Sequence, residues 1–210
     1  FGQISHSFPK ENLFADRKIR AQALHYFANH ELLAIELFAW ALLSFDEIDE
    51  MQTRILIRTI GDEQKHLRMY ITRIEELGGA FGDFPLSDYL WSELTQSQSF
   101  EAFSAAMALT FEQANLDHAL YFRSVFAKVG DSRTAEILNV VYRDEIKHVA
   151  AGTKTLLSSR NRGGSSLWDF YVKLLPGSLS PARAKGKVFS EDSRRKAGLP
   201  DDFVSQLRLF

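Results

Sequence analysis

The sequence contains no cysteine among its 210 residues. This absence excludes a disulfide scaffold, a zinc site built on thiolates and an iron–sulfur cluster held by cysteine. It also agrees with a reducing compartment, so we expect a cytoplasmic protein. The rest of the composition is typical of a globular protein, because 45% of the residues are hydrophobic and 25% are charged.

Long hydrophobic runs are missing as well. The most apolar stretch, residues 32–43, is short and contains Glu36, whereas a helix that crosses a bilayer needs about 20 apolar residues. The sequence also shows no signal-peptide pattern. We therefore expect a protein with no membrane partner.

Acidic and basic residues are unevenly distributed along the chain. The net charge is −2, but residues 160–198 carry nine Lys and Arg against three Asp and Glu. This basic segment has two interpretations. It packs on the acidic remainder of the chain as structural cover, which its few aromatic residues favour. Alternatively, it lines the entrance for an anionic substrate such as a phosphorylated metabolite or nucleic acid.

Four long helices are predicted. Residues 17–44 contain no Pro or Gly and have a helical hydrophobic period, and similar patterns cover about 50–77, 99–129 and 131–159. Gly130 is expected to end the third helix and Asp131 to cap the fourth. Short helices are expected near residues 88–95, 167–174, 190–197 and 201–208.

The connections between the long helices are short, long and short. This order predicts an all-α fold, a ferritin-like four-helix bundle with one long crossover between its second and third helices. No stretch alternates between apolar and polar residues as a strand would. We expect a single ferritin-like domain over residues 1–210, with the bundle core at about 17–159 and a basic C-terminal extension at 160–210.

Two pentapeptides, DEQKH at residues 62–66 and DEIKH at 144–148, repeat one pattern on the second and fourth helices. In each of them a glutamate and a histidine stand three residues apart and share one helix face. The first and third helices place Glu31 and Glu112 on their apolar faces, in matching positions upstream of the two motifs. The two halves of the chain therefore carry the same pattern.

Four carboxylates in an apolar core need compensation, because desolvation and mutual repulsion oppose their charges. Two divalent cations would balance four glutamates and two neutral imidazoles. A glutamate from each of two helices plus Glu-x-x-His from the other two is the ligand set of di-iron and di-manganese carboxylate bundles. The pattern thus predicts a site for two Fe ions, with Mn as the alternative. The predicted ligands are Glu31, Glu63, His66, Glu112, Glu145 and His148.

Asp62 and Asp144 directly precede the glutamates of the two motifs. A ligating imidazole usually donates its second N–H to a carboxylate. We therefore expect each aspartate to accept a hydrogen bond from the histidine of the opposite motif. If the repeated pattern were a coincidence, its glutamates and histidines would instead be solvated on helix surfaces.

These features resemble the ferritin-like superfamily of di-iron carboxylate proteins, over residues 20–159. More narrowly, the stretches HYFANHELLAIELFAWALLSF, DEQKH, LTFEQANLDHALYF, RDEIKHV and SPARAKG are similar to a ferritin-like family known as a domain of unknown function. The resemblance implies the fold and the metal site. It implies no substrate, because the superfamily includes ferritins, rubrerythrins, manganese catalases, ribonucleotide reductase small subunits and tRNA-modifying hydroxylases.

Glu36 and Asp117 each follow a predicted ligand by five residues. One interpretation makes either of them an extra metal ligand, of the kind that rubrerythrin-type peroxidases use. In the other interpretation, each pairs with an arginine between helices.

Tyr70 lies four residues after His66 on the apolar stripe. Its position resembles that of the redox tyrosine of ribonucleotide reductase small subunits, which makes it a candidate catalytic residue. The alternative is a core tyrosine whose hydroxyl is hydrogen-bonded. His25, His30 and His118 fall outside the stripes, and we expect them at the surface or around the ligands.

Three functions are compatible with such a site. The first is an O2-dependent oxidoreductase, a hydroxylase or oxidase, because the loop at 79–98 and the residues after 160 are sufficient to build a substrate pocket. The second is a ferroxidase or a peroxide-handling protein of the rubrerythrin or manganese-catalase type, and the third is a non-enzymatic metal-binding partner protein. The expected partners are O2 or peroxide, a small-molecule substrate and an electron donor that the sequence does not identify. Nucleic acid is disfavoured, and the helix faces allow a homodimer.

Overall fold

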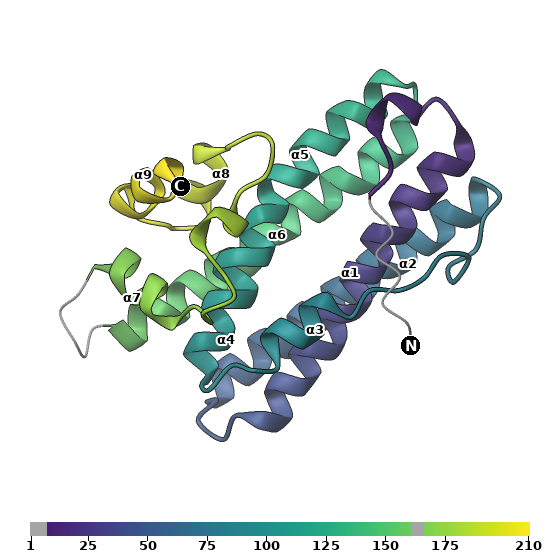
Figure 1. Cartoon of the computed structure of the whole chain (residues 1–210). Coiled ribbons are helices and arrows are strands. Elements are labelled where there is room, and N and C mark those ends of the chain that lie inside the picture. Colours follow the sequence, from purple (N-terminus) through teal and green to yellow (C-terminus); the bar gives the residue numbers. More distant parts are fainter. Residues whose placement is uncertain (1–7, 161–165) are drawn as a thin grey trace. The chain divides into compact units, whose positions relative to one another are not determined.

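The computed structural model describes residues 8–160 and 166–210, and all regular structure in these ranges is helical (Figure 1). The all-α prediction is therefore confirmed for the described residues. Each predicted helix corresponds to an observed one, and the short η1 and η3 turns are additional. The elements are η1 (Glu11–Leu13), α1 (Arg17–Ser44), α2 (Glu50–Glu76), α3 (Tyr89–Leu94), α4 (Phe100–Ala106), η2 (Met107–Glu112), α5 (Gln113–Lys128), α6 (Ser132–Arg160), α7 (Leu167–Leu174), η3 (Pro181–Ala184), α8 (Glu191–Lys196) and α9 (Asp201–Leu209).

The chain forms two compact units. Unit 1 comprises the chain up to Ser92 together with Arg123–Ile137, and unit 2 comprises Glu93–Phe122 together with Leu138–Phe210. Helices α5 and α6 contribute residues to both units. The single ferritin-like domain and the four-helix bundle stay predictions.

The helix ends have the caps that their sequences indicate. Asp49 and Gln52 form a reciprocal capping box at the start of α2. Gly130 has a φ of 79°, a left-handed conformation that ends α5. The Asp131 carboxylate then accepts the backbone N–H of Thr134 at 3.0 Å and caps α6, as predicted.

In unit 1, helices α1 and α2 lie side by side (Figure 1). The buried Asp131 joins them to the start of α6, because it pairs with Arg73 of α2 at 2.8 Å and with Arg20 of α1 at 3.1 Å. Burial by itself raises the pKa of Asp131, but the Thr134 and Arg73 hydrogen bonds outweigh burial and hold the pKa below its usual value. The carboxylate therefore stays charged and holds the three helices together.

The loop after α2 folds over α1. His25 accepts the backbone N–H of Gly82 at 2.9 Å, and Asn29 exchanges hydrogen bonds with the backbone of Ser87 at 2.7 and 3.1 Å. Burial lowers the pKa of His25, which favours the neutral ring that this bond needs. His25 was expected at the surface or around the ligands, but it is buried and holds the loop instead.

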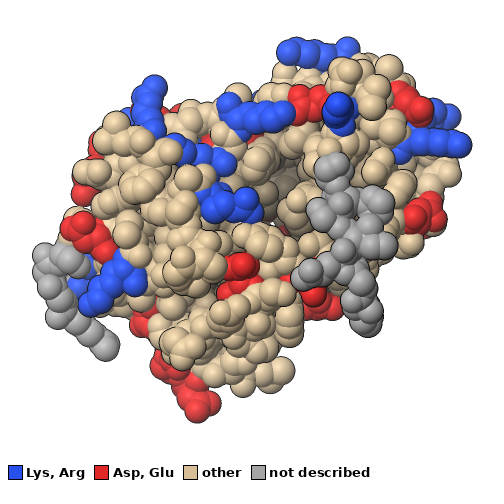
Figure 2. Space-filling view, viewed as in Figure 1, with Lys and Arg blue, Asp and Glu red and all other residues tan. Residues whose placement is uncertain are grey.

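Unit 2 contains a large apolar cluster that includes side chains from much of the basic segment. Side chains of α4, η2 and α6 pack there against side chains of α7, η3 and α9. Representative members are Ala105, Leu109, Val149, Leu156, Tyr171 and Phe203. Figure 2 shows Lys and Arg side chains at the surface on the side where α8 and α9 lie. Residues 161–165, which include Arg162 of the basic segment, lie outside the described residues.

A buried ion pair fixes the basic segment to α5. Arg194 and Asp117 are both fully buried, and two parallel N–H···O bonds of 2.8 Å join them. Arg194 also donates to the carbonyls of Ser190 and Ala184, while Asp117 accepts the N–H of Gly186. Of the two interpretations of Asp117, pairing with an arginine is the one that the structure supports. This part of the basic segment is structural cover.

The third long helix contains a π-helical segment, η2, which the hydrophobic period did not predict. Its Thr110 hydroxyl donates to the Ala105 carbonyl at 3.0 Å and also contacts the hydroxyl of the buried Tyr171. Helix α6 approaches this segment closely at Gly152, where a Cβ would lie 2.3 Å from the Cβ of Ala108. Such π segments are rare and are frequent at functional sites.

We expect Gly152→Ala to lower the free energy of unfolding by about 1–3 kcal/mol, because the added methyl overlaps the π segment. Gly61→Ala is the matched control on α2, where a Cβ has nothing within 4 Å. There the better helix propensity of alanine should stabilise the protein by about 0.5–1 kcal/mol. Urea unfolding followed by circular dichroism measures both changes. Equal effects of the two substitutions would contradict the close approach.

We expect Arg194→Met to lower the free energy of unfolding by about 3–5 kcal/mol, because it leaves a buried carboxylate without its counter-charge. The neighbouring Arg195 is the control, since its ion pairs lie at the surface, and Arg195→Met should have little effect. In the double variant Asp117→Asn/Arg194→Met, the loss should be smaller than the sum of the two single losses. Additive losses would mean that the pair is not coupled.

Candidate functional site

Unit 1 brings together three of the predicted ligands, Glu31 of α1 and Glu63 and His66 of α2. Their exposed fractions are 5%, 1% and 0%. His66 Nδ1 lies 3.2 Å from Glu63 Oε2 and 3.9 Å from Glu31 Oε2. One ligand atom from each of the three side chains lies within 4.8 Å of the others. We call this group the unit 1 trio.

The burial of the unit 1 trio changes its proton affinities. Burial raises the pKa of Glu31 well above its usual value, and the nearby charge of Glu63 raises it further. Burial lowers the pKa of His66, but hydrogen bonds to Glu31 and Glu63 outweigh burial and raise that pKa to about 11. Both pKa shifts favour the protonated forms of these groups, which reduces the buried negative charge of the trio. A divalent cation would displace such protons and serve the same purpose.

Unit 2 brings together the other three predicted ligands, Glu112 at the end of η2 and Glu145 and His148 of α6. All three are buried, with exposed fractions of 3%, 1% and 4%. His148 Nδ1 lies 3.6 Å from Glu145 Oε2 and 3.9 Å from Glu112 Oε1. Their ligand atoms also lie within 4.8 Å of one another. We call this group the unit 2 trio.

Asn115 belongs to the surroundings of the unit 2 trio, and the sequence did not mark it as a site residue. Its side-chain N–H donates to Glu145 Oε1 at 3.2 Å. Asn115 follows Glu112 by three residues, which is the spacing between glutamate and histidine in the two motifs. That spacing was the signal that could have identified it. This hydrogen bond holds one oxygen of Glu145 and so orients the carboxylate.

The two trios have the same composition and closely similar geometry. Each joins one glutamate to a Glu-x-x-His pair on a neighbouring helical segment, and each places a histidine nitrogen 3.2–3.9 Å from two carboxylates. Two carboxylates and one neutral imidazole balance the charge of one divalent cation. Oxygen-rich ligands with an imidazole suit iron or manganese. The residues of each trio therefore fit a metal ion.

The other predicted site residues lie near the trios along the sequence. Tyr70 is buried one helical turn beyond His66, and its ring centroid is 5.8 Å from that of Phe27. This position agrees with a core tyrosine, and the redox role stays a prediction. Glu36 is exposed on α1, so the structure gives no support to its role as an extra ligand.

Asp62 and Asp144 each accept a hydrogen bond from the lysine three residues later on the same helix. The distances are 2.9 Å from Lys65 and 2.6 Å from Lys147. The expected bond from each aspartate to the histidine of the opposite motif would join one unit to the other, and it stays a prediction. Asp144 is buried and Asp62 is half-buried.

None of the helices within residues 8–160 and 166–210 has both the length and the apolar character needed to cross a membrane. This finding agrees with the short hydrophobic runs of the sequence.

Comparison with known proteins identifies relatives of the chain. An uncharacterised protein of Haemophilus influenzae is 26% identical over 176 residues, which is 80% of this chain and 60% of the relative. The chain thus spans less than two thirds of the length of this curated relative. No solved structure gives a significant match. Residues 4–205 match the family described as "Protein of unknown function (DUF455)". Because this match covers nearly the whole chain, the protein belongs to the DUF455 family.

Proposed function

We propose that the protein is a di-metal carboxylate protein of ferritin-like fold and that it acts as an O2-dependent oxidoreductase on a small organic substrate. Two iron ions are the proposed metals, with manganese as the alternative. Each trio supplies three ligands, and the two trios together supply four carboxylates and two imidazoles. This is the ligand set of di-iron and di-manganese bundles.

The observation that carries this proposal is the burial of two equivalent Glu-Glu-His trios. A surface role for these residues would leave them solvated, yet none of the six is more than 5% exposed. Burying two carboxylates side by side is costly unless a positive charge accompanies them. The same combination of two glutamates and one histidine is buried twice, on separate helices. A shared function explains this repetition better than chance burial at two places.

The pairing of the trios is the second step of the proposal. In a ferritin-like bundle the two helix hairpins face each other, and the ligands of both meet near the middle. Asp62 and Asp144 would each hold the histidine of the opposite motif, which fixes the tautomer and leaves the other imidazole nitrogen for the metal.

In the proposed reaction the metal ions would supply electrons, and the protein would bind the ions and orient their ligands. When bound, two ferrous ions supply electrons that reduce O2. The two trios would hold the ions, Asn115 donates a hydrogen bond that orients Glu145, and the apolar cluster of unit 2 would limit the access of water to its trio. Hydroxylation also requires an external reductant, since the substrate provides two of the four electrons that O2 accepts.

We expect the protein to bind two metal ions when it is purified and loaded with ferrous salt without oxygen. Glu63→Gln and Glu145→Gln each remove one carboxylate from a buried trio with little change of shape, so each should lower the content to one ion or fewer. Elemental analysis after gel filtration measures the bound metal. Metal that binds only to the folded chain should also raise the melting temperature of the parent more than that of either variant.

Glu36→Gln is the matched control for metal binding, because Glu36 is an exposed glutamate on the same helix as Glu31. It should keep the full metal content and the full rise in melting temperature. Undiminished metal in both Glu63→Gln and Glu145→Gln would refute the assignment of the trios.

We expect ferrous-loaded protein to oxidise its two bound ions when O2 is admitted, but not to oxidise a continuing excess of ferrous salt. Oxygen uptake and the iron absorbance of the same sample measure the two processes. Rapid oxidation of many ferrous ions per chain, with mineral formation, would instead identify a ferroxidase. Rapid O2 release from peroxide would identify catalase chemistry, and no reaction with either oxidant would favour a metal-binding partner protein.

A further inference from the structure

Glu112 of the unit 2 trio is the last residue of the π-helical segment η2, and the basic segment contacts its neighbours. The buried hydroxyl groups of Thr110 and Tyr171 lie 2.9 Å apart, and the Thr110 hydroxyl donates to the Ala105 carbonyl at 3.0 Å. A hydroxyl has only one proton to donate, so Tyr171 is the donor to Thr110. Tyr171 belongs to α7, 61 residues later in the chain, and it thus holds the residue two positions before Glu112.

Gln113, which directly follows Glu112, is held by the same segment. With its amide oriented so that both polar groups have partners, its N–H donates to the Leu109 carbonyl at 2.8 Å and its oxygen accepts Arg194 Nε–H at 3.0 Å. The other two guanidinium nitrogens of Arg194 donate to Asp117 and to backbone carbonyls. Gln113 and Arg194 are both fully buried, so water does not compete for these bonds.

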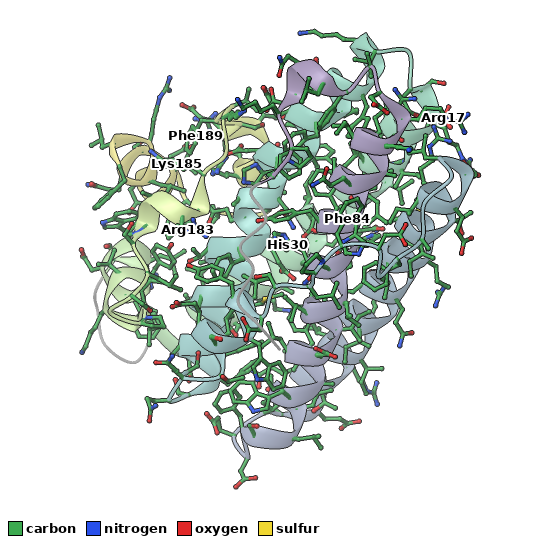
Figure 3. All side chains as sticks on the ribbon, turned by 45° about the vertical axis from the view of Figure 1, so that its right-hand side comes forward. Arg17, His30, Phe84, Arg183, Lys185 and Phe189 are labelled. Carbon is green, nitrogen blue, oxygen red and sulfur yellow. The ribbon has the colours of Figure 1, made fainter. Side chains whose placement is uncertain are left out.

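Phe111 lies between these two contacts and receives a third one. The Arg183 guanidinium carbon lies 5.9 Å from the ring centroid of Phe111, which is near enough for a cation–π attraction. Figure 3 shows Arg183 and Phe189 on the basic segment, where the ring of Phe189 covers the Arg194 guanidinium at 4.0 Å. The residues on both sides of Glu112 are therefore contacted by the basic segment.

The π turn makes the position of Glu112 depend on such contacts. It holds an additional residue compared with an α-helical turn, and one residue corresponds to about 100° of rotation in an α-helix. The close approach of Gly152 to Ala108 restrains the upstream part of the segment, and the buried ion pair of Asp117 restrains the helix that follows. The additional residue is accommodated between these two points. Glu112 Oε1 lies 3.9 Å from His148 Nδ1, and this distance depends on how the turn is held.

The corresponding ligand of unit 1 has a different setting. Glu31 lies within the regular α-helix α1. An α-helix fixes the directions of its side chains through its own i→i−4 backbone bonds. A single π turn is a rare geometry that needs support from its surroundings. The two trios are alike in composition, but the contacts around Glu112 make the unit 2 trio the one that depends on the basic segment.

We propose that Tyr171 is a positioning residue, which acts through Thr110 to hold the π turn and so keeps Glu112 in place as a metal ligand. Arg194 supports the same turn through Gln113. This inference rests on the proposed function and adds how the unit 2 trio is controlled. Since coupling between two equilibria is reciprocal, metal bound at this trio should also stabilise the docking of the basic segment.

The test compares two tyrosines that each form a hydroxyl bond between the basic segment and the rest of unit 2. Tyr171→Phe removes the bond to Thr110. Tyr142→Phe is the matched control, because it removes a bond of 2.8 Å to Ser193. In the metal-free full chain, we expect amide hydrogen exchange of residues 107–113 to be roughly threefold to tenfold faster in Tyr171→Phe, since one buried hydrogen bond is lost. Tyr142→Phe should exchange there like the parent.

Titration of the same proteins with Mn(II), followed by the EPR signal of the free ion, measures metal affinity. We expect Tyr171→Phe to bind one of two ions roughly threefold to tenfold more weakly, and Tyr142→Phe to bind like the parent. Thr110→Val should reproduce the loss, because it removes the hydroxyl with little change of shape. Thr110→Ser keeps the hydroxyl and should restore the affinity of the parent. Mn(II) should also slow the exchange of residues 107–113 and 167–174 in the parent.

A purely structural role for Tyr171 gives a different result, because it would lower the melting temperature of Tyr171→Phe and Tyr142→Phe alike without changing the Mn(II) affinity of either. Equal affinities of the parent, Tyr171→Phe and Thr110→Val would thus overturn the positioning role and keep the proposed function. A parent that binds no metal would reject the proposed function and the positioning role with it. Exchange at residues 107–113 that Tyr171→Phe leaves unchanged would show that Tyr171 does not hold the π turn.

Discussion

The burial of carboxylates is the constraint on which the candidate site depends. The protein buries several acidic side chains and balances them in two ways. Asp117 and Asp131 are each paired with guanidinium groups, which fix the basic segment in unit 2 and three helices in unit 1. The trios instead combine two carboxylates with one imidazole, and in the unit 1 trio the two carboxylates raise the pKa of His66 to about 11. Pairs with arginine are permanent structural supports. Protons that balance a pair of carboxylates can be replaced by a metal ion, and a metal site requires this exchange.

Most of the secondary structure followed from local rules. The hydrophobic period and the positions of Gly130 and Asp131 predicted the helices and their ends, because caps and apolar faces depend on residues close in sequence. The π segment could not be predicted in this way. The Thr110 hydroxyl bonds to Ala105 within the helix, but Tyr171 and Gly152, which also contact this segment, lie far along the chain. These last two contacts are tertiary, and the sequence of the helix itself does not specify them.

In the candidate site, too, the features that depend on local sequence were predictable and those that depend on tertiary contacts were not. The neighbourhood of Glu63 and His66 follows from their spacing on one helix, and Glu31 joins them because α1 and α2 are consecutive and lie side by side. The role of Asn115 could have been predicted, since its spacing from Glu112 repeats the spacing of glutamate and histidine in the two motifs. The burial of His25 could not have been predicted, because it requires the loop after α2 to fold back over α1. The choice for Asp117 was settled by Arg194, 77 residues later, which no local pattern links to it.

One short segment explains part of the uneven charge of the sequence. Arg194 points inward and neutralises a buried acid, whereas Arg183 and Lys187 remain exposed on backbone that the same acid anchors. The buried pair and the bonds to Gly186 and Ser190 therefore anchor the backbone that carries the exposed cations. Gly186 allows this backbone to approach Asp117, because a Cβ at residue 186 would lie 2.8 Å from the Cβ of Asp117. The interpretation of this segment as structural cover therefore explains its buried arginine, its glycine and its anchored backbone.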